Sequence, residues 1–445
     1  MPPLHQAPRG TRDFYPEDMA VRRHIEAAWR KASIDHGFDE VDGPTFEHLD
    51  LYTVKSGEGI VNELFSFRRA GGESTYALRP EFTPTLARMV AAKGASLPVP
   101  TKWFAIPSFF RAERPQRGRL REFFQWNVDV VGQGGAKADA EVIAVAVGAL
   151  ERLGLGPGDV QVRLSHRRAV ANILARLGIA EDRLPAAFEL LDRRDKLEPE
   201  AFARRSGELG LAGDTLARFD GLVRATVPVS ESIEGLVRAA AIPEADVIDL
   251  VEMRSALEAV GIADWCRYDL GIVRGLAYYT GTVFEIHAVG AVERAVAGGG
   301  RYDGLIELFG GAPTPACGFG MGDVVLGLLL EERGLLGGAD GHAGLLPRPD
   351  VFVIAAGSEA AEQLLLPLVT EFRRAGLHAR HTYRATRNVG KLLGEASRSR
   401  ARFAVILGQE LERPEGPQAM VKDLLSGAQR PVLLASVVKE IAATA

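Results

Sequence analysis

Residues 110–129 read FRAERPQRGRLREFFQWNVD and bring basic and aromatic side chains together in one short stretch. We expect two strands joined by a Pro/Gln/Gly turn. Side chains alternate along a strand, so Arg119 and Arg121 share one face, and Phe123 and Gln125 continue it. Guanidinium groups bind phosphate through paired hydrogen bonds, and an aromatic ring offers a flat surface for a base. The stretch therefore indicates a nucleotide site, and the alternative is a solvated, salt-bridged hairpin. Its arginines are Arg111, Arg114, Arg117, Arg119 and Arg121.

The pattern FRxERPQxGRxREFxQ in this stretch resembles the second signature motif of class II aminoacyl-tRNA synthetases in its histidine-specific form, without gaps. The resemblance implies that Arg111 holds the α-phosphate of ATP and that Glu113 contacts the nucleotide. It also implies that Phe123 stacks on adenine. The loop around Gln116–Arg119, with Gln116, Arg117 and Arg119, is then expected to meet the acceptor end of a tRNA.

Residues 273–285, VRGLAYYTGTVFE, are similar to a signature of histidine–tRNA ligases. A selective site for imidazole must satisfy two ring nitrogens, and phenol and carboxyl groups suit that purpose. The resemblance implies that Tyr278 and Tyr279 supply phenols and Asp129 a carboxylate, with Gln125 nearby. Arg274 is expected to carry catalysis, because a fixed guanidinium stabilises the charge that builds on a phosphorus under attack.

Two further segments resemble parts of the same family. In LRPEFT, residues 78–83, Glu81 is expected to pair with the ammonium of the substrate and Thr83 to add a hydrogen bond. In AGGGRYDGL, residues 297–305, the glycines allow the backbone to approach a bound molecule closely. The default interpretation of such a glycine run is a tight turn.

The sequence departs from the family pattern at two positions. Ala277 stands where the signature RGLDYY has aspartate. Val325, in GFGMGDVVL, stands where the third class II motif has an arginine for the tail of ATP. Arg301, or an arginine of residues 114–121, is the candidate to replace it.

Composition is that of an ordinary globular protein, and 445 residues predict more than one domain. The two cysteines, Cys266 and Cys317, form no CxxC pair, which argues against a zinc site or a disulfide framework. No apolar run approaches the length of a membrane span, and the N-terminus lacks the apolar segment of a signal peptide. We expect a reducing cytoplasm, no membrane contact and no metal site built from side chains.

The order of elements predicts an α+β fold, in which helices flank a mainly antiparallel sheet. A catalytic domain over residues 1–334 is expected to contain a helical insertion at about 167–258. Residues 335–349 are rich in glycine and proline and predict a linker. Residues 350–445 predict a small parallel α/β domain. The expected strands are 38–41, 75–78, 103–110, 123–131, 160–164, 281–287 and 317–321, and after the linker 351–356, 379–383 and 403–407.

Net charge is −5, but residues 348–445 carry 14 basic and 10 acidic side chains. A basic face on an acidic body suits a polyanion of defined shape, and a solvated helix face is the alternative. The segment resembles the anticodon-binding domain shared by several class II ligases. Arg384, Arg387, Lys391, Arg398 and Arg400 are candidate phosphate contacts, and Asn388 a candidate for base edges.

Taken together, the resemblance implies ATP-dependent attachment of histidine to tRNA(His) with Mg²⁺, by a homodimer whose interface lies near Pro44. DNA is not an expected partner. Two alternative functions would also require a histidine-binding pocket. One is the non-catalytic, ligase-like regulatory subunit of ATP phosphoribosyltransferase, which the missing arginine favours. The other is a paralogue that adenylates histidine without charging tRNA.

Overall fold

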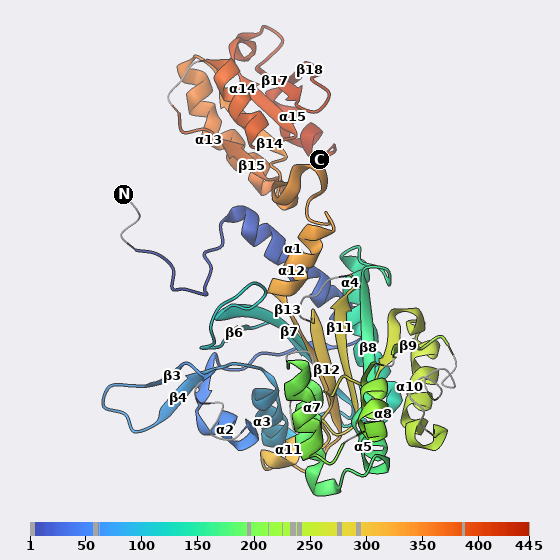
Figure 1. The fold of residues 1–445 in the computed structure, drawn as a ribbon. Coiled ribbons are helices and arrows are strands. Elements are labelled where there is room, and N and C mark those ends of the chain that lie inside the picture. The colour runs from blue at the N-terminus through green and yellow to red at the C-terminus, as the bar shows by residue number, and fades with distance from the viewer. Residues whose placement is uncertain are drawn as a thin grey trace. The chain divides into compact units, whose positions relative to one another are not determined.

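A computed structural model describes residues 5–444 apart from 57–60, 62, 194–196, 212, 225, 232–236, 238–242, 274–277, 291–294 and 385–387. The chain forms two compact units, Met1–Leu345 and Leu346–Ala445 (Figure 1). The division falls within the segment 335–349. Part of that segment, the 3₁₀ helix η7 (Gly338–Leu345), packs on helix α1 (Pro16–Asp35) of the first unit.

A 10-stranded sheet organises the first unit in the described part of the chain, in the order β1-β5-β7-β13-β12-β11-β8-β10-β9 with β6 beside β7. Neighbours are antiparallel except for the parallel pairs β1–β5 and β8–β10, so the expected mainly antiparallel sheet is confirmed. The strands are β1 (Asp39–Glu40), β5 (Thr101–Ala105), β6 (Ser108–Phe110), β7 (Glu122–Val131), β8 (Val160–His166), β9 (Thr226–Pro228), β10 (Cys266–Asp269), β11 (Thr282–Ala288), β12 (Ala297–Arg301) and β13 (Ala316–Gly322).

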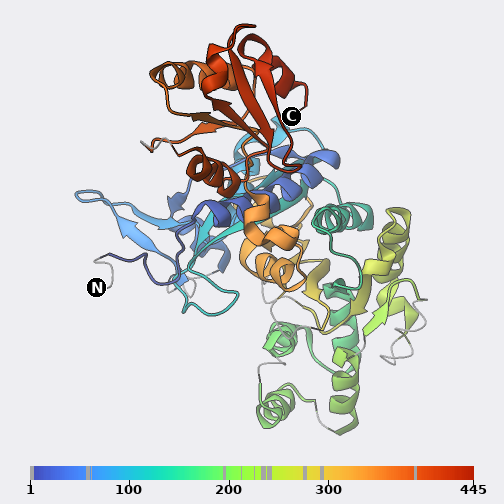
Figure 2. The same cartoon turned by 90° about the horizontal axis from the view of Figure 1, so that it is seen from above.

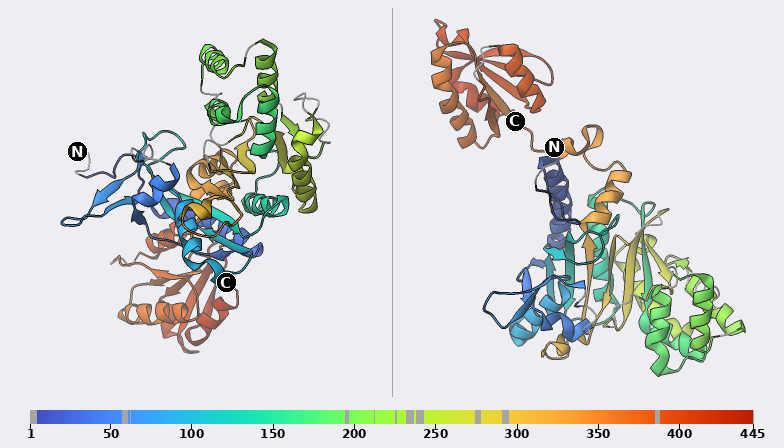
Figure 3. Two further views of the ribbon diagram at one scale, coloured as in Figure 1. Left: turned by 90° about the horizontal axis from the view of Figure 1, so that it is seen from below. Right: turned by 60° about the vertical axis from the view of Figure 1, so that its left-hand side comes forward.

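Helices α1 (Pro16–Asp35), α4 (Ala136–Arg152) and α12 (Asp323–Glu332) cover one face of this sheet (Figure 3). Trp126 of β7 stacks on Trp29 of α1 with ring centroids 5.9 Å apart. Its indole nitrogen donates to Ser33 Oγ at 3.0 Å. Because side chains alternate along β7, the residues between Trp126, Val128 and Val130 face the other side of the sheet.

On that other side lie helices α3 (Thr83–Lys93) and α11 (Leu305–Leu308), which contact each other. A separate 3-stranded sheet stands beside them, in the order β2 (Phe46–His48), β4 (Thr75–Leu78), β3 (Ser66–Arg68). Helix α2 (Asp50–Ser56) packs on β2 and α3, and the 3₁₀ turn η2 (Gly94–Ser96) follows α3.

The insertion after β8 extends away from the large sheet (Figure 2). Its helices are α5 (Arg167–Arg176), α6 (Leu184–Arg193), α7 (Pro199–Glu208), α8 (Gly213–Arg224) and α10 (Ile248–Ala259), with the 3₁₀ turns η3 (Glu181–Arg183), η5 (Glu244–Val247) and η6 (Ala263–Trp265). The insertion is not wholly helical, because β9 pairs with β10 and extends the edge of the large sheet. Three residues at the edge of a sheet are too short to show a period in sequence.

The second unit has a 5-stranded sheet in the order β15-β14-β16-β17-β18. Strands β14 (Val351–Ala355), β15 (Ala379–His381) and β16 (Phe403–Leu407) are parallel, as expected. The expectation of a purely parallel domain is wrong, because β17 (Gln418–Asp423) and β18 (Gln429–Leu433) continue the sheet antiparallel. Helices α13 (Glu359–Arg374), α14 (Val389–Arg398) and α15 (Leu434–Ala442) pack around it, and the 3₁₀ turn η8 (Gln409–Glu412) precedes β17. Among the helices of the described residues, none has the length and apolar character needed to cross a bilayer.

Candidate active site

A cavity of about 270 Å³ opens on the face of the large sheet opposite α1 and α4. Its walls come from segments far apart in sequence: the start of α3, the arginine-rich loop, β7, the segment before β11, and β12–β13. The cavity brings together nine of the site residues predicted from sequence, namely Glu81, Thr83, Arg111, Arg119, Phe123, Gln125, Asp129, Tyr278 and Tyr279.

Strand β7 supplies one wall of the cavity through alternate residues. Gln125, Asn127 and Asp129 face the cavity, whereas the intervening residues pack on the helices. Asn127 and Asp129 are 4% and 5% exposed. No sequence motif assigns a role to Asn127, although it lies midway between two predicted ligands on one strand face.

Glycines of β13 leave room for these side chains. Gly318 pairs with Asp129, and Gly320 pairs with Asn127. A Cβ atom added at Gly318 would lie 2.0 Å from Asp129 Oδ1, and one added at Gly320 would lie 2.1 Å from Gln125 Nε2. The glycines are therefore required by the close approach of the polar side chains of β7, rather than by a turn.

The end of the cavity at Asp129 holds a pair of buried polar groups. The phenol of Tyr302, which follows β12, donates a hydrogen bond to Oδ1 of Asp129. Burial raises the pKa of Asp129 to about 7, although the hydrogen bond from Tyr302 opposes that shift. The ring of Tyr278 meets the ring of Tyr302 edge-on at 6.0 Å. Tyr302 was missed in the sequence, where only the glycines of AGGGRYDGL drew attention.

The other end of the cavity carries the arginine and aromatic pair expected for a nucleotide. The guanidinium of Arg111 lies 5.1 Å from the ring centre of Phe123. Its Nε donates to the carbonyl of Pro80 at 3.1 Å, which fixes the side chain at the rim. A cation beside an exposed ring face can hold a phosphate while the ring stacks on a base.

The arginines of residues 111–121 lie in a loop, so their expected placement in strands is wrong. Strand pairing stops at Phe110 and Glu122. Beyond it the loop is closed by bonds between Arg111 N and Arg121 O at 2.9 Å and within a tight turn from Gln116 to Arg119. The next ladder donors are taken by other segments: Arg121 N donates to Gly10 O at 2.8 Å and Ala112 N donates to Glu63 O at 2.9 Å, which explains the early end of the strands.

Within this loop the predicted residues occupy different positions. Arg119 lines the cavity and forms an ion pair with Glu113, whose carboxylate does not line it. Gln116 and Arg117 are exposed at the tip. The carboxylate of Glu113 therefore orients the arginine that reaches the cavity.

Val325 lines the cavity at the start of α12, where the family motif would place an arginine. Of the candidate replacements, Arg301 is wrong: it is buried, pairs with Asp139 at 2.7 Å and with Asp303 at 2.9 Å, and does not line the cavity. Arg119 is the candidate that the loop brings to the cavity wall.

Three predicted residues lie outside the described residues: Arg274, Ala277 and Arg387. Two described residues on either side of Arg274 and Ala277 accept hydrogen bonds from Arg167 through their backbone carbonyls. Arg167 Nη1 donates to Val273 O at 3.1 Å, and Arg167 N donates to Gly281 O at 3.0 Å. The segment that contains both residues thus begins and ends against the first residue of α5.

In the second unit, Lys391 is exposed in the first turn of α14. Asn388 accepts a hydrogen bond from the backbone N–H of Lys391 at 3.0 Å and caps that helix. The capping role accounts for Asn388 without a base contact. Among the described residues, no group of three or more acidic, histidine or cysteine side chains is arranged to hold a metal ion.

Comparison with known proteins agrees with this geometry. The family model described as histidyl-tRNA synthetase matches residues 10–322. The chain is 38% identical over 435 residues to the histidine–tRNA ligase of Halobacterium salinarum, covering 96% of each chain. It is 38% identical over 404 residues to that of Opitutus terrae, covering 90% of each. The fold matches the crystal structure of the histidyl-tRNA synthetase from Nostoc sp. PCC 7120 with a TM-score of 0.78 at 23% identity, over 99% of both chains. Similarity of this extent shows that the chain belongs to the histidyl-tRNA synthetase family.

Proposed function

We propose that this protein attaches histidine to tRNA(His) in two steps, through a histidyl-adenylate. The observation that carries the proposal is one cavity with two different ends. Arg111 and Phe123 stand at one end, and Asp129 with Tyr302 stands at the other. An amino acid and a nucleotide bound end to end in this cavity would meet near its middle.

Histidine binds with its imidazole toward Asp129 in this proposal. The carboxylate accepts from one ring N–H, and phenols of Tyr278 and Tyr279 serve the remaining polar positions. Glu81 and Thr83 line the same cavity and bind the ammonium of the substrate. A buried carboxylate rejects analogues that lack the ring N–H, because the oxygen that faces the ligand is then left without a donor.

ATP binds at the end that holds Arg111 and Phe123. Adenine stacks on Phe123, and Arg111 holds the α-phosphate. Arg119 lines the cavity from the arginine-rich loop and is paired with Glu113. In this proposal it holds the β- and γ-phosphates of ATP. It thereby replaces the third-motif arginine, whose position Val325 occupies. Mg²⁺ enters with the nucleotide, since it prefers phosphate oxygens and water to a cage of side chains.

In the first step an oxygen of the histidine carboxylate attacks the α-phosphorus of ATP, and pyrophosphate leaves. Arg274, placed by the sequence signature, stabilises the charge on the phosphorus. In the second step a ribose hydroxyl at the end of the tRNA attacks the carbonyl carbon of the adenylate, and AMP leaves with the hydroxyl proton. Neither step requires a nucleophile from the protein.

The tRNA is contacted by both units in this proposal. Gln116 and Arg117, exposed at the loop tip, meet the acceptor end. In the second unit Arg387 and Lys391 hold phosphates. Tyr383 is 93% exposed beside His381, with ring centroids 4.6 Å apart, and offers a stacking surface for an unpaired base.

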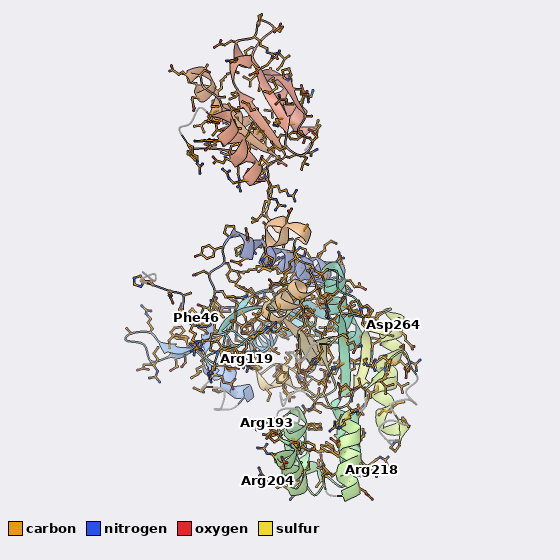
Figure 4. All side chains as sticks on the ribbon, turned by 45° about the horizontal axis from the view of Figure 1, so that its top comes forward. Phe46, Arg119, Arg193, Arg204, Arg218 and Asp264 are labelled. Carbon is orange, nitrogen blue, oxygen red and sulfur yellow. The ribbon has the colours of Figure 1, made fainter. Side chains whose placement is uncertain are left out.

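A homodimer is supported by exposed aromatic side chains on the 3-stranded sheet. Phe46, two residues after Pro44, lies in the 3-stranded sheet (Figure 4). It is 49% exposed, and its ring centroid lies 5.6 Å from those of Phe67 and Tyr76. Apolar clusters of this kind on a surface mark interaction sites. If this face joins two copies, Phe46→Glu combined with Phe67→Glu yields a monomer by analytical ultracentrifugation. An unchanged sedimentation coefficient would place the interface elsewhere.

A cytoplasmic location suits the two cysteines, which are buried and free. It also suits a protein whose partners are tRNA and ATP.

One assay in two stages tests the function. Histidine-dependent exchange of pyrophosphate into ATP reports adenylation, and transfer of labelled histidine to tRNA(His) reports charging. We expect both. Exchange without charging would support the adenylating paralogue, and neither reaction would support the regulatory subunit.

A further inference from the structure

Asn127 occupies the middle of the polar face of β7, between Gln125 and Asp129. It is 4% exposed and lines the cavity. Its partner across the sheet is Gly320, which has no side chain to cover the asparagine. A buried amide at the wall of a binding cavity requires partners for its donor and acceptor groups.

The hydrogen bonds of Asn127 fix which way its amide points. Its Nδ2 donates to the backbone carbonyl of Gln125 at 3.2 Å. A backbone carbonyl only accepts, so the nitrogen of Asn127 must face it and the oxygen must face away. That oxygen, Oδ1, accepts a hydrogen bond from Nε2 of Gln125 at 2.8 Å.

The orientation of Asn127 in turn determines that of Gln125. With Nε2 of Gln125 committed to Asn127, the other branch of its amide, Oε1, is the group that remains for a ligand. Within the described residues Oε1 of Gln125 receives no hydrogen bond. Gln125 therefore presents an acceptor, and not a donor, to whatever occupies the cavity.

An ammonium group is the part of an amino acid that needs such an acceptor. It has three N–H donors. Glu81 and Thr83, which line the same cavity, offer two acceptors, and Oε1 of Gln125 offers the third. A reversed amide would bring its NH₂ group against the ammonium, so that two donors would face each other.

We infer that Asn127 is a positioning residue that holds the amide of Gln125 with its oxygen toward the ammonium of bound histidine. The inference rests on the proposed function, since it takes histidine as the occupant. Asn127 itself touches no reacting atom. Loss of its acceptor frees Gln125 to rotate and weakens the recognition of the ammonium while the imidazole end stays intact.

The test compares two ligands that differ in the ammonium alone: histidine and imidazole-4-propionate. Dissociation constants are measured by calorimetry for the wild type, Asn127→Ala and Asn127→Leu. We expect both variants to bind histidine about tenfold more weakly, the loss typical of one hydrogen bond to a charged group, and to bind imidazole-4-propionate as the wild type does. Retained binding of imidazole-4-propionate also shows that each variant is folded.

Two further variants complete the design. Asn127→Asp keeps an acceptor opposite Nε2 of Gln125 and is expected to retain the preference for histidine over imidazole-4-propionate. In a Gln125→Ala background, Asn127→Ala is expected to have no additional effect on histidine binding.

Equal weakening of both ligands, or additive effects in the double variant, would overturn the inference and leave Asn127 a merely structural residue. A wild-type protein that binds no histidine would instead overturn the proposed function.

Discussion

The phenol of Tyr302 donates a hydrogen bond to Oδ1 of Asp129 in the wall of the cavity. Both side chains are buried, and the ring of Tyr278 meets Tyr302 edge-on. This pair gives the cavity one acceptor carboxylate whose position is fixed before a ligand arrives. Preorganisation of this kind lowers the cost of binding, because little ordering remains to be done.

Asp129 is expected to destabilise the folded protein at neutral and alkaline pH. Burial raises its pKa to about 7, above the value of 3.8 expected for an exposed aspartate. A raised pKa gives a stability contribution that is complete below pH 4 and is lost as pH rises toward 7. Asp129→Asn removes this titration, so its free energy of unfolding should exceed that of the wild type by up to a few kcal/mol at pH 8, with little gain at pH 4. Urea unfolding at the two pH values measures the difference, and a gain that is equal at both would contradict the assignment.

Tyr302→Phe should impair histidine recognition selectively. The variant keeps the ring but removes the O–H that Asp129 accepts, and the pKa of Asp129 should rise further without it. We expect the KM for histidine in pyrophosphate exchange to rise about tenfold and the KM for ATP to change little. Tyr15→Phe, at a 70% exposed tyrosine, is the control. A parallel rise in both KM values would point to general disruption of the cavity.

Alanine substitutions at the glycines of β12 and β13 should have two different effects: some should destabilise the fold, and others should impair only ligand binding. A Cβ at Gly299 would lie 2.2 Å from the carbonyl oxygen of Gly318, which is backbone and cannot yield, so Gly299→Ala should destabilise the fold by about 1–3 kcal/mol. A Cβ at Gly320 would meet the flexible end of Gln125, so Gly320→Ala should fold normally and bind histidine poorly. Gly322→Ala, with no atom within 4 Å of its added Cβ, is the matched control for folding. Melting curves and calorimetry separate these outcomes, and equal stability of Gly299→Ala and Gly322→Ala would refute the packing argument.

Two arginines that could replace the missing third-motif arginine should respond differently to mutation. Arg119→Ala is expected to raise the KM for ATP about tenfold without loss of stability, because its side chain lines the cavity. Arg301→Met leaves Asp139 buried without its partner and should cost about 3–5 kcal/mol of stability. Arg114→Ala, at an exposed position of the same loop, is the control for Arg119 in an exchange assay without tRNA. An unchanged KM for ATP in Arg119→Ala would remove it as the replacement.

Substitution of Tyr383 should weaken the charging of full-length tRNA(His) but not the charging of an acceptor-stem minihelix. Tyr383→Ala is expected to raise the KM for tRNA(His) in charging about tenfold, whereas Tyr383→Phe keeps the stacking ring and should behave as the wild type. Leu425→Ala, at a 78% exposed leucine of the same unit, is the control. A minihelix that contains only the acceptor stem should be charged equally by all three variants. A defect with the minihelix as well would exclude a contact to the anticodon loop.

Sequence periodicity was sufficient to predict many elements of the fold. The bounds of β4 and β16 agree with expectation, since apolar residues and turn signals delimit both strands. The sequence does not predict β17 and β18, because β17 (QAMVKD) has only a short apolar run between polar residues and β18 is mostly exposed. Alternation of side chains predicts strands beyond Phe110, but backbone pairing ends there and the arginines lie in a loop.

Sequence motifs include residues that line the cavity, but they do not include cavity residues whose position depends on strand register. Gln125 and Asp129 were identified as part of a motif. Asn127 and Tyr302 were not, because their importance depends on the pairing of β7 with β13 and on the turn after β12. Arg301 was offered as a phosphate ligand because the sequence does not reveal Asp139, 162 positions away, as its partner.

The central claim is that one cavity binds imidazole at Asp129 and adenine at Phe123. A crystal structure of the protein with a non-hydrolysable sulfamoyl analogue of histidyl-adenylate tests it most directly. We predict an imidazole nitrogen within hydrogen-bonding distance of Asp129, the ammonium beside Gln125, the sulfamoyl group beside Arg111, and adenine stacked on Phe123. An analogue bound with adenine toward Asp129, or bound outside this cavity, would contradict the claim.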